Sequence, residues 1–192
     1  MTDTSADAPT DVDLKADLTD DVALVTGATR GIGAEIAAEL ADLGATVYAG
    51  ARDPDDVTAA DQHAIRLDVT DDDEVRAAVD RIEREQGSLD VLVNNAGVFA
   101  RSGPLHEMDT ADFDDTMAVN LRGPVVLTKH ALPLLLDGTG ARVVTLSSGL
   151  GRFTDGRMDG GYPAYRLSKV GVGGLTAYLD GEYGDQGLIA NA

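Results

Sequence analysis

Tyr165 and Lys169 are the two residues best suited to move a proton together. Residues four apart lie on one face of a helix, so a helix through this segment places the phenol beside the ammonium. The positive charge stabilises the phenolate form, which suits Tyr165 to work as a general acid or base. Of the five tyrosines, this is the one that has a lysine four positions later. Taken alone, the pair also fits the surface of an ordinary amphipathic helix.

A glycine-rich run near the start of the chain is suited to binding the phosphates of a dinucleotide. Gly27, Gly31 and Gly33 follow the apolar run Val22–Val25 and open a helical pattern. Glycines permit a tight turn and let the backbone at a helix N-terminus approach a pyrophosphate. The three residues between Gly27 and Gly31 distinguish this run from the common G-x-G-x-x-G spacing. A plain glycine turn is the structural alternative.

The elements that must position these residues alternate along the chain. We predict six strands, at Val22–Val25, Ala45–Ala49, Ile65–Leu67, Leu89–Val93, Arg142–Leu146 and Leu188–Ala190. We predict helices at Ile32–Leu43, Val75–Ile82, Ala111–Leu136 and Tyr162–Asp180, and the long third one is expected to bend near Pro124 or Pro133. Strands joined by helical crossovers form a parallel sheet covered on both faces. The sequence therefore predicts an α/β fold of three layers with a doubly wound parallel sheet, whose last strand is incomplete.

The charge balance excludes some partners. The chain has 34 acidic and 15 basic residues and a formal net charge of −19. Such a surface repels nucleic-acid phosphates and anionic membranes, so we expect no nucleic acid and no membrane as a partner. The acidic excess favours a halophile protein, because concentrated salt screens the self-repulsion. An acidic protein of ordinary salt with a disordered tail is the alternative.

The first residues and the missing cysteines narrow the class further. Residues 1–20 lack the basic and apolar regions of a secretion signal, so we predict a disordered acidic tail there and one domain over residues 21–192. No apolar run reaches the ~20 residues of a membrane span, and a cytoplasmic protein is expected. The absence of cysteine excludes thiolate catalysis, and His63, His106 and His130 lack metal-type spacing, so no metal site is predicted.

Several motifs together make a resemblance. The T-G-x-x-x-G-x-G run is similar to that of the short-chain dehydrogenase/reductase family. Further matches follow in the order of that family: Asp68-Val69, Asn94-Asn95-Ala96-Gly97, Asn120, Ser147-Ser148, Tyr165 and Lys169. The resemblance runs from about Asp21 to the last residue. It implies a Rossmann-type fold and an enzyme that moves a hydride between a nicotinamide cofactor and a small carbonyl or alcohol substrate.

The resemblance also implies catalytic roles. Tyr165 would be the general acid or base, and Lys169 would also hold the nicotinamide ribose. Ser148 would orient the substrate, although Tyr165 follows it 17 positions later, which exceeds the usual spacing and leaves Ser147 as an alternative. Asn120 would hold a water in a proton relay from Lys169.

The cofactor residues follow in the same way. Asp68 would bind the adenine amino group, Val69 would flank the ring, and Asn94 and Gly97 would brace the central strand and the floor of the nicotinamide pocket. The complete expected set is Gly27, Thr29, Arg30, Gly31, Ile32, Gly33, Arg52, Asp68, Val69, Asn94, Ala96, Gly97, Tyr165 and Lys169.

The choice of nicotinamide rests on two arginines. NAD-binding sites place an acid near the end of the second strand, where this chain has Arg52, and Arg30 lies inside the glycine run. A guanidinium grips a phosphate with a planar fork, so NADP(H) is favoured over NAD(H). The alternative is that these arginines form surface salt bridges, for example Arg52 with Asp53.

The end of the chain leaves the activity open. Members of the family continue beyond this point with a Pro-Gly turn, a substrate lid and a last edge strand, so the chain is expected to be truncated at its C-terminus. The leading hypothesis is an NADP(H)-dependent oxidoreductase. A dinucleotide-binding protein with weak or no turnover, and a different reaction on the same scaffold such as epimerisation or dehydration, are the alternatives. A homo-oligomer is also allowed.

Overall fold

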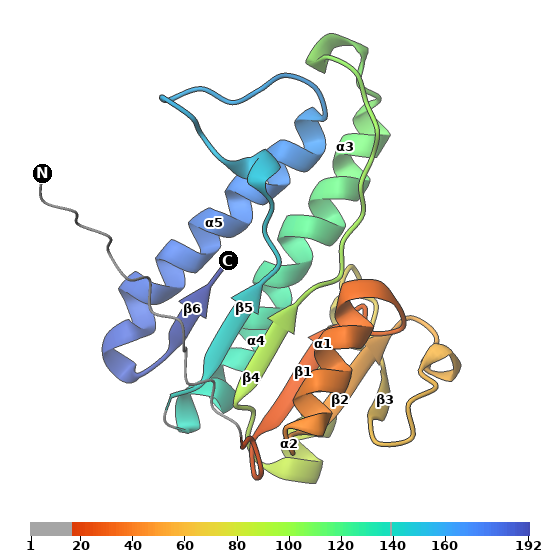
Figure 1. The fold of residues 1–192 in the computed structure, drawn as a ribbon, viewed down its shortest axis with the longest axis vertical. Coiled ribbons are helices and arrows are strands. Elements are labelled where there is room, and N and C mark those ends of the chain that lie inside the picture. Colours follow the sequence, from red (N-terminus) through yellow and green to blue (C-terminus); the bar gives the residue numbers. More distant parts are fainter. Residues whose placement is uncertain (1–16, 139) are drawn as a thin grey trace, which may run out of the picture.

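The computed structural model describes residues 17–138 and 140–192, which form one parallel sheet with helices on both faces (Figure 1). The six strands are β1 (Val22–Thr26), β2 (Thr46–Ala51), β3 (His63–Arg66), β4 (Val91–Asn94), β5 (Arg142–Thr145) and β6 (Ile189–Asn191). Their order in the sheet is β3-β2-β1-β4-β5-β6, and every pair is parallel. The chain reverses its winding direction between β1 and β4, where ligands bind in open sheets of this kind.

Five α-helices connect these strands. They are α1 (Gly31–Asp42), α2 (Asp72–Gln86), α3 (Thr110–Met117), α4 (Gly123–Asp137) and α5 (Pro163–Tyr183). None of the helices within the described residues is both long and apolar enough to cross a membrane. Where predicted and observed boundaries differ, they do so by a few residues, as is usual at frayed ends.

The core consists of two apolar layers separated by the sheet. Leu24 of β1 and Leu92 of β4 point to the layer formed with α2, α4 and α5. Val25 and Val93, the next residues on the same strands, point to the layer formed with α1. Side chains alternate across a strand, so a strand buried on both faces is apolar over most of its length, as β1 is from Val22 to Val25. The expected three-layer, doubly wound α/β fold is confirmed.

The predicted long helix is divided by a π-helical turn. Residues Ala118–Arg122 have this wider geometry and join α3 to α4 one residue before Pro124. Pro133 lies inside α4, which continues through it. Single π-helical turns often occur at functional sites because they displace one residue from the regular helical position. Here the turn contains Asn120.

Only part of the predicted acidic tail is described. Residues 1–16 lie outside the described residues, whereas in residues 17–20 the side chain of Leu18 packs against the domain. Leu18 is buried in the α1 layer, and its backbone N–H donates to the Leu43 carbonyl oxygen at 2.7 Å. The packed part of the chain therefore includes residues on the N-terminal side of the expected boundary at residue 21.

Candidate active site

The glycine run forms the turn between β1 and α1. Gly27 and Gly31 have φ angles of +64° and +57°, the left-handed conformation that glycine adopts most easily. Arg30 precedes α1 without a side-chain hydrogen bond to the first helical turn. The uncapped N–H groups of that turn thus remain available for an anion, and the positive end of the helix dipole points to the same place.

Asn95 braces this turn from the neighbouring strand. Its side-chain Nδ2 donates to the carbonyl oxygens of Thr26 (2.8 Å) and Gly27 (3.2 Å). The backbone N–H groups of Asn95 and Ala96 both donate to Thr26 Oγ1 at 2.9 Å. A Cβ on Gly33 would overlap both Asn95 Nδ2 and the Gly27 carbonyl oxygen. Sequence reasoning assigned Asn95 no role, although its place directly after β4 was the signal that it faces the end of β1.

Tyr165 and Lys169 lie in one cavity beyond the carboxyl ends of β4 and β5. The cavity has a volume of about 230 Å³ and is lined by Ile32, Asn95, Gly97, Val98, Phe99, Leu146, Ser147, Tyr165 and Lys169. Lys169 Nζ lies 5.5 Å from the centre of the Tyr165 ring and donates to the Leu146 carbonyl oxygen at 2.5 Å. Burial lowers the pKa of Lys169, because the protein interior disfavours its charged form.

The two serines after β5 occupy different environments. Ser147 is exposed and lines the cavity. Ser148 is half-buried, and its Oγ accepts a hydrogen bond from the Leu150 backbone N–H at 3.1 Å. The structure therefore brings Ser147 into the cavity wall and places Ser148 at the first turn of the following loop.

Asn120 fixes the segment after β4. Its side chain is buried and pairs with the Val98 backbone in both directions, accepting from N–H at 2.8 Å and donating to C=O at 2.9 Å. Nδ2 also donates to Ser168 Oγ at 3.2 Å. Because both N–H groups of the amide are used in this way, Asn120 links the cavity-lining Val98 to α5.

Phe99 is a cavity residue that sequence reasoning missed. The rings of Phe99 and Tyr165 make an edge-to-face contact, with their centroids 4.6 Å apart. The Phe99 centroid also lies 5.1 Å from that of Tyr162. It is 43% exposed. An isolated phenylalanine after Gly97 carries no pattern that marks it as part of a site, so only the fold brings it to the tyrosine.

Arg30 and Arg52 are both exposed, and neither forms an ion pair within the described residues. The expected alternative partner, Asp53, instead accepts a hydrogen bond from Asp55 N–H and caps the turn Pro54–Asp56. The side chains of Arg30 and Arg52 are therefore not held by the surface salt bridges that we considered.

Asp68 follows β3 and is shaped by its own turn. Its Oδ1 accepts from the Thr70 hydroxyl (2.7 Å) and from the Thr70 N–H (2.9 Å). These two bonds, with a smaller contribution from Arg52, lower the pKa of Asp68. Both bonds use Oδ1, which leaves Oδ2 for a ligand.

Val69 and Asn94, two further residues of the expected cofactor set, have buried side chains. Val69 belongs to the core, and a Cβ on Gly123 would lie 2.9 Å from its Cγ2. The Asn94 amide donates to Thr128 Oγ1 at 3.2 Å. Neither side chain is among those that line the cavity of Tyr165 and Lys169.

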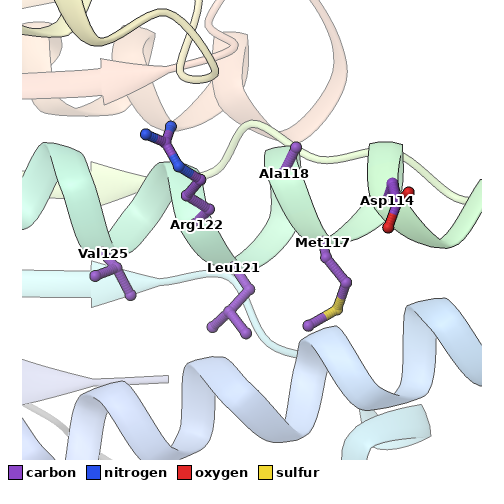
Figure 2. A pocket seen from close by; sticks show the side chains of 6 residues that line it. All are labelled: Asp114, Met117, Ala118, Leu121, Arg122 and Val125. Atoms are coloured by element: carbon purple, nitrogen blue, oxygen red, sulfur yellow. The ribbon is translucent and has the colours of Figure 1, made fainter. Parts of the chain in front are cut away.

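A second hollow, of about 420 Å³, lies along the helical segment formed by α3, the π-helical turn and α4 (Figure 2). It is lined by Asp114, Met117, Ala118, Leu121, Arg122 and Val125, and Met117 and Leu121 point towards α5. Arg122 is already paired with Asp72 of α2, at 2.8 Å. This hollow contains none of the residues that the sequence singled out.

No group of three or more histidine, aspartate or glutamate side chains suited to a metal ion occurs in residues 17–138 and 140–192.

The chain matches the family model of the short chain dehydrogenases over residues 21–192. It is 40% identical over 179 residues to cis-4-hydroxycyclohexanecarboxylate dehydrogenase of Sinomonas cyclohexanicum, and the matched region covers 89% of this chain and 70% of that protein. It is 37% identical over 180 residues to the 3-oxoacyl-(acyl-carrier-protein) reductase FabG of Staphylococcus aureus, covering 88% and 71%. The structure of a gluconate 5-dehydrogenase of Burkholderia cenocepacia, in complex with NADP and tartrate, matches with a TM-score of 0.83 at 26% identity, over 92% of this chain and 71% of that one.

The chain therefore belongs to the short chain dehydrogenase family. The expected family and the expectation of an oxidoreductase enzyme are confirmed. The chain spans about 70% of the length of the two curated relatives named above.

Proposed function

We propose that this chain is an NADP(H)-dependent oxidoreductase that interconverts a small carbonyl compound and an alcohol. The observation that carries the proposal is the shared cavity of Tyr165, Lys169 and Ile32, in which the proton-transfer pair meets the first turn of α1. A proton donor and a dinucleotide cradle at one opening are the two parts that carbonyl reduction requires.

The residues divide the work as follows. When bound, the nicotinamide supplies or accepts the hydride. In reduction, Tyr165 donates its phenolic proton to the carbonyl oxygen; in oxidation, the phenolate takes a proton from the alcohol. The Lys169 ammonium stabilises the phenolate that remains after donation. A hydroxyl of Ser148, or of Ser147 on the cavity wall, donates a hydrogen bond to the same substrate oxygen and orients it.

The binding residues fit a phosphorylated dinucleotide. The turn at Gly27 and Gly33 has no room for side chains, and the first turn of α1 is uncapped, so a pyrophosphate can approach the backbone. Arg30 and Arg52 are exposed and without ion-pair partners in the described part of the chain. We infer that these two cations hold a 2′-phosphate, and that Asp68 Oδ2 accepts from the adenine amino group.

Replacement of Tyr165 tests the function. We expect Tyr165→Phe to lower kcat by about 100-fold or more, because the proton donor is lost, while the Kd for NADPH stays unchanged. NADPH oxidation is followed with a panel of ketones, which includes cyclohexanone carboxylates, 3-oxoacyl thioesters and 5-ketogluconate because relatives are named for such chemistry. Tyr178→Phe, an exposed tyrosine of the same helix, is the matched control and should keep full activity.

The same panel separates the alternatives. A wild-type chain that binds NADPH and oxidises it with no ketone would be a dinucleotide-binding protein without turnover. A Tyr165→Phe variant as active as the wild type would remove the phenol from its proposed role.

Arg52 tests the preference for NADP(H). We expect Arg52→Asp to weaken NADPH binding by about tenfold or more and to improve NADH binding, because the carboxylate repels the 2′-phosphate and accepts from the 2′-hydroxyl. Fluorescence titration with both nucleotides measures the two Kd values. Arg84→Asp, an equal charge change on an exposed residue of α2, should leave their ratio unchanged. An equal loss for both nucleotides in Arg52→Asp would contradict the preference.

A further inference from the structure

Arg166 is a buried cation that the proposed chemistry does not use. It lies on α5 directly after Tyr165 and is only 6% exposed. Its Nε donates to the Gly161 carbonyl oxygen at 2.9 Å and its Nη1 to the Leu150 carbonyl oxygen at 3.0 Å. Among the described residues it has no carboxylate partner. Because a buried charge costs free energy, a cation held by carbonyl oxygens alone needs a structural reason.

Both carbonyl groups belong to the connection between β5 and α5. Leu150 lies at the start of this loop and Gly161 at its end, so one guanidinium joins two points that are distant along the chain. The loop between them rises beyond the carboxyl ends of the strands (Figure 1). Its middle is largely exposed. The planar fork of an arginine can hold two acceptors in fixed directions, which a lysine cannot do.

The loop also approaches the catalytic helix closely at its start. A Cβ on Gly151 would lie 2.8 Å from the Lys169 backbone carbon and 2.8 Å from Lys169 Cβ. At the other end, Tyr162 has a φ angle of +52°, a strained conformation for a tyrosine. The bond from Arg166 to Gly161, beside Tyr162, helps to hold this conformation.

Leu150 connects Arg166 to Ser148. The Leu150 carbonyl oxygen accepts from Arg166, and the N–H of the same residue donates to Ser148 Oγ at 3.1 Å. A hydroxyl group has one proton to donate and two lone pairs that accept. Since Ser148 accepts from Leu150, its own proton points elsewhere and remains free to donate to a substrate oxygen.

We propose that Arg166 is a positioning residue, which fixes the Ser148 hydroxyl through Leu150 and so sets its orientation toward the substrate. The proposal rests on the proposed oxidoreductase function and deepens it. Of the two serines considered for the substrate-orienting role, it takes Ser148, whose Oγ is bonded to Leu150. The longer spacing between Ser148 and Tyr165 is then accommodated by a loop whose two ends are tied to α5.

A double-mutant cycle tests the connection. We expect Arg166→Met to lower kcat by about tenfold without changing the Kd for NADPH, because a misdirected donor slows the chemical step while the cofactor site is intact. In a Ser148→Ala background the same replacement should lower kcat by less than about twofold, since the hydroxyl that it positions is gone. Arg157→Met, an exposed arginine of the same loop, is the matched control and should leave kcat unchanged. An equal loss in both backgrounds would overturn the proposal.

Amide hydrogen exchange at Leu150 provides a readout that needs no turnover. We expect this amide to exchange about tenfold faster in Arg166→Met than in the wild-type chain, while amides of β1 keep their rates. Arg166→Lys, which offers no fork, should give the same direction with a smaller effect, and it replaces the Met variant if that one does not fold. Unchanged exchange at Leu150 in a folded variant would overturn the proposal. A wild-type chain without turnover would contradict the proposed function, whereas the exchange result would still decide whether Arg166 holds Leu150.

Discussion

At the scale of single residues, the candidate site combines charge with burial. Lys169 is 8% exposed, yet its proposed role requires an ammonium beside the Tyr165 ring. One hydrogen bond to the Leu146 carbonyl oxygen offsets part of the cost of burial. The lowered pKa of Lys169 records what remains of that cost.

This cost has a consequence for stability that depends on pH. Burial lowers the pKa of Lys169 in the folded chain, whereas in the unfolded chain it returns to about 10.4. Between these two values the unfolded state binds more protons, so the free energy of unfolding contributed by Lys169 rises with pH. We expect the unfolding free energy of the wild type, relative to Lys169→Met, to increase as the pH rises toward about 10.4, by at most about 1.4 kcal/mol per pH unit.

Urea unfolding at a series of pH values measures this difference, in which other titrating groups cancel. Lys129→Met, at an exposed position of α4, is the control for which we expect no such trend. A difference between wild type and Lys169→Met that stays level across the range would refute the argument.

At the scale of elements, the glycine turn that we propose to bind the cofactor phosphates is held by two strands, β1 and β4. β1 and β4 are neighbours although β2, β3 and two helices separate them in the sequence (Figure 1). This adjacency lets Asn95, at the end of β4, hold the carbonyl groups of Thr26 and Gly27 at the end of β1. The glycine turn is therefore shaped by a side chain from the next strand as well as by its own glycines.

Gly33 lies where Asn95, which follows β4, and the turn after β1 are in close contact. We expect Gly33→Ala to destabilise the fold by about 1–3 kcal/mol, because its Cβ would overlap Asn95 Nδ2 and the Gly27 carbonyl oxygen. We also expect it to weaken NADPH binding by about tenfold or more, because the turn must open. Denaturant unfolding and fluorescence titration measure the two effects.

The matched replacement is Gly173→Ala, on the exposed side of α5, where no atom lies within 4 Å of the added Cβ. It should stabilise the chain by about 0.5–1 kcal/mol, since alanine is the better helix former. A Gly33→Ala variant that is stabilised as Gly173→Ala is would contradict the expectation that the turn has no space for a Cβ at Gly33.

At the scale of the whole molecule, the main electrostatic feature is the large negative net charge. The formal net charge of −19 comes from 34 acidic residues against 15 basic ones. Like charges at this density repel one another across the surface and disfavour the compact state. Salt shortens the Debye length from about 10 Å at 0.1 M to about 3 Å at 1 M, which removes most of this repulsion.

We propose that the chain is adapted to high salt, and its thermal unfolding tests this. We expect the Tm to rise by about 5–10 °C between 0.1 M and 1 M KCl, which corresponds to about 2–3 kcal/mol for a domain of this size. Because screening is nearly complete at 1 M, the rise should level off above that concentration. A Tm that does not change with KCl would contradict the proposal.

Local patterns were enough to predict the elements and the position of Tyr165 and Lys169 on one helix, α5. Helical spacing places Tyr165 and Lys169 on one face, and the apolar runs of β1 and β4 mark buried strands; both depend on neighbours within a few residues. The order of these elements also made the doubly wound sheet predictable, because parallel strands require crossover connections, which are usually helices.

Contacts between distant residues followed from packing alone. Three contacts join residues with no shared local pattern: the brace from Asn95 to Gly27, the edge-to-face contact of Phe99 with Tyr165, and the bonds of Arg166 to both ends of its loop. Such partners are chosen by which strands become neighbours and how a loop returns to a helix. The chemistry of a side chain determines which kinds of groups it can bind. The tertiary structure determines which of those groups lies within reach.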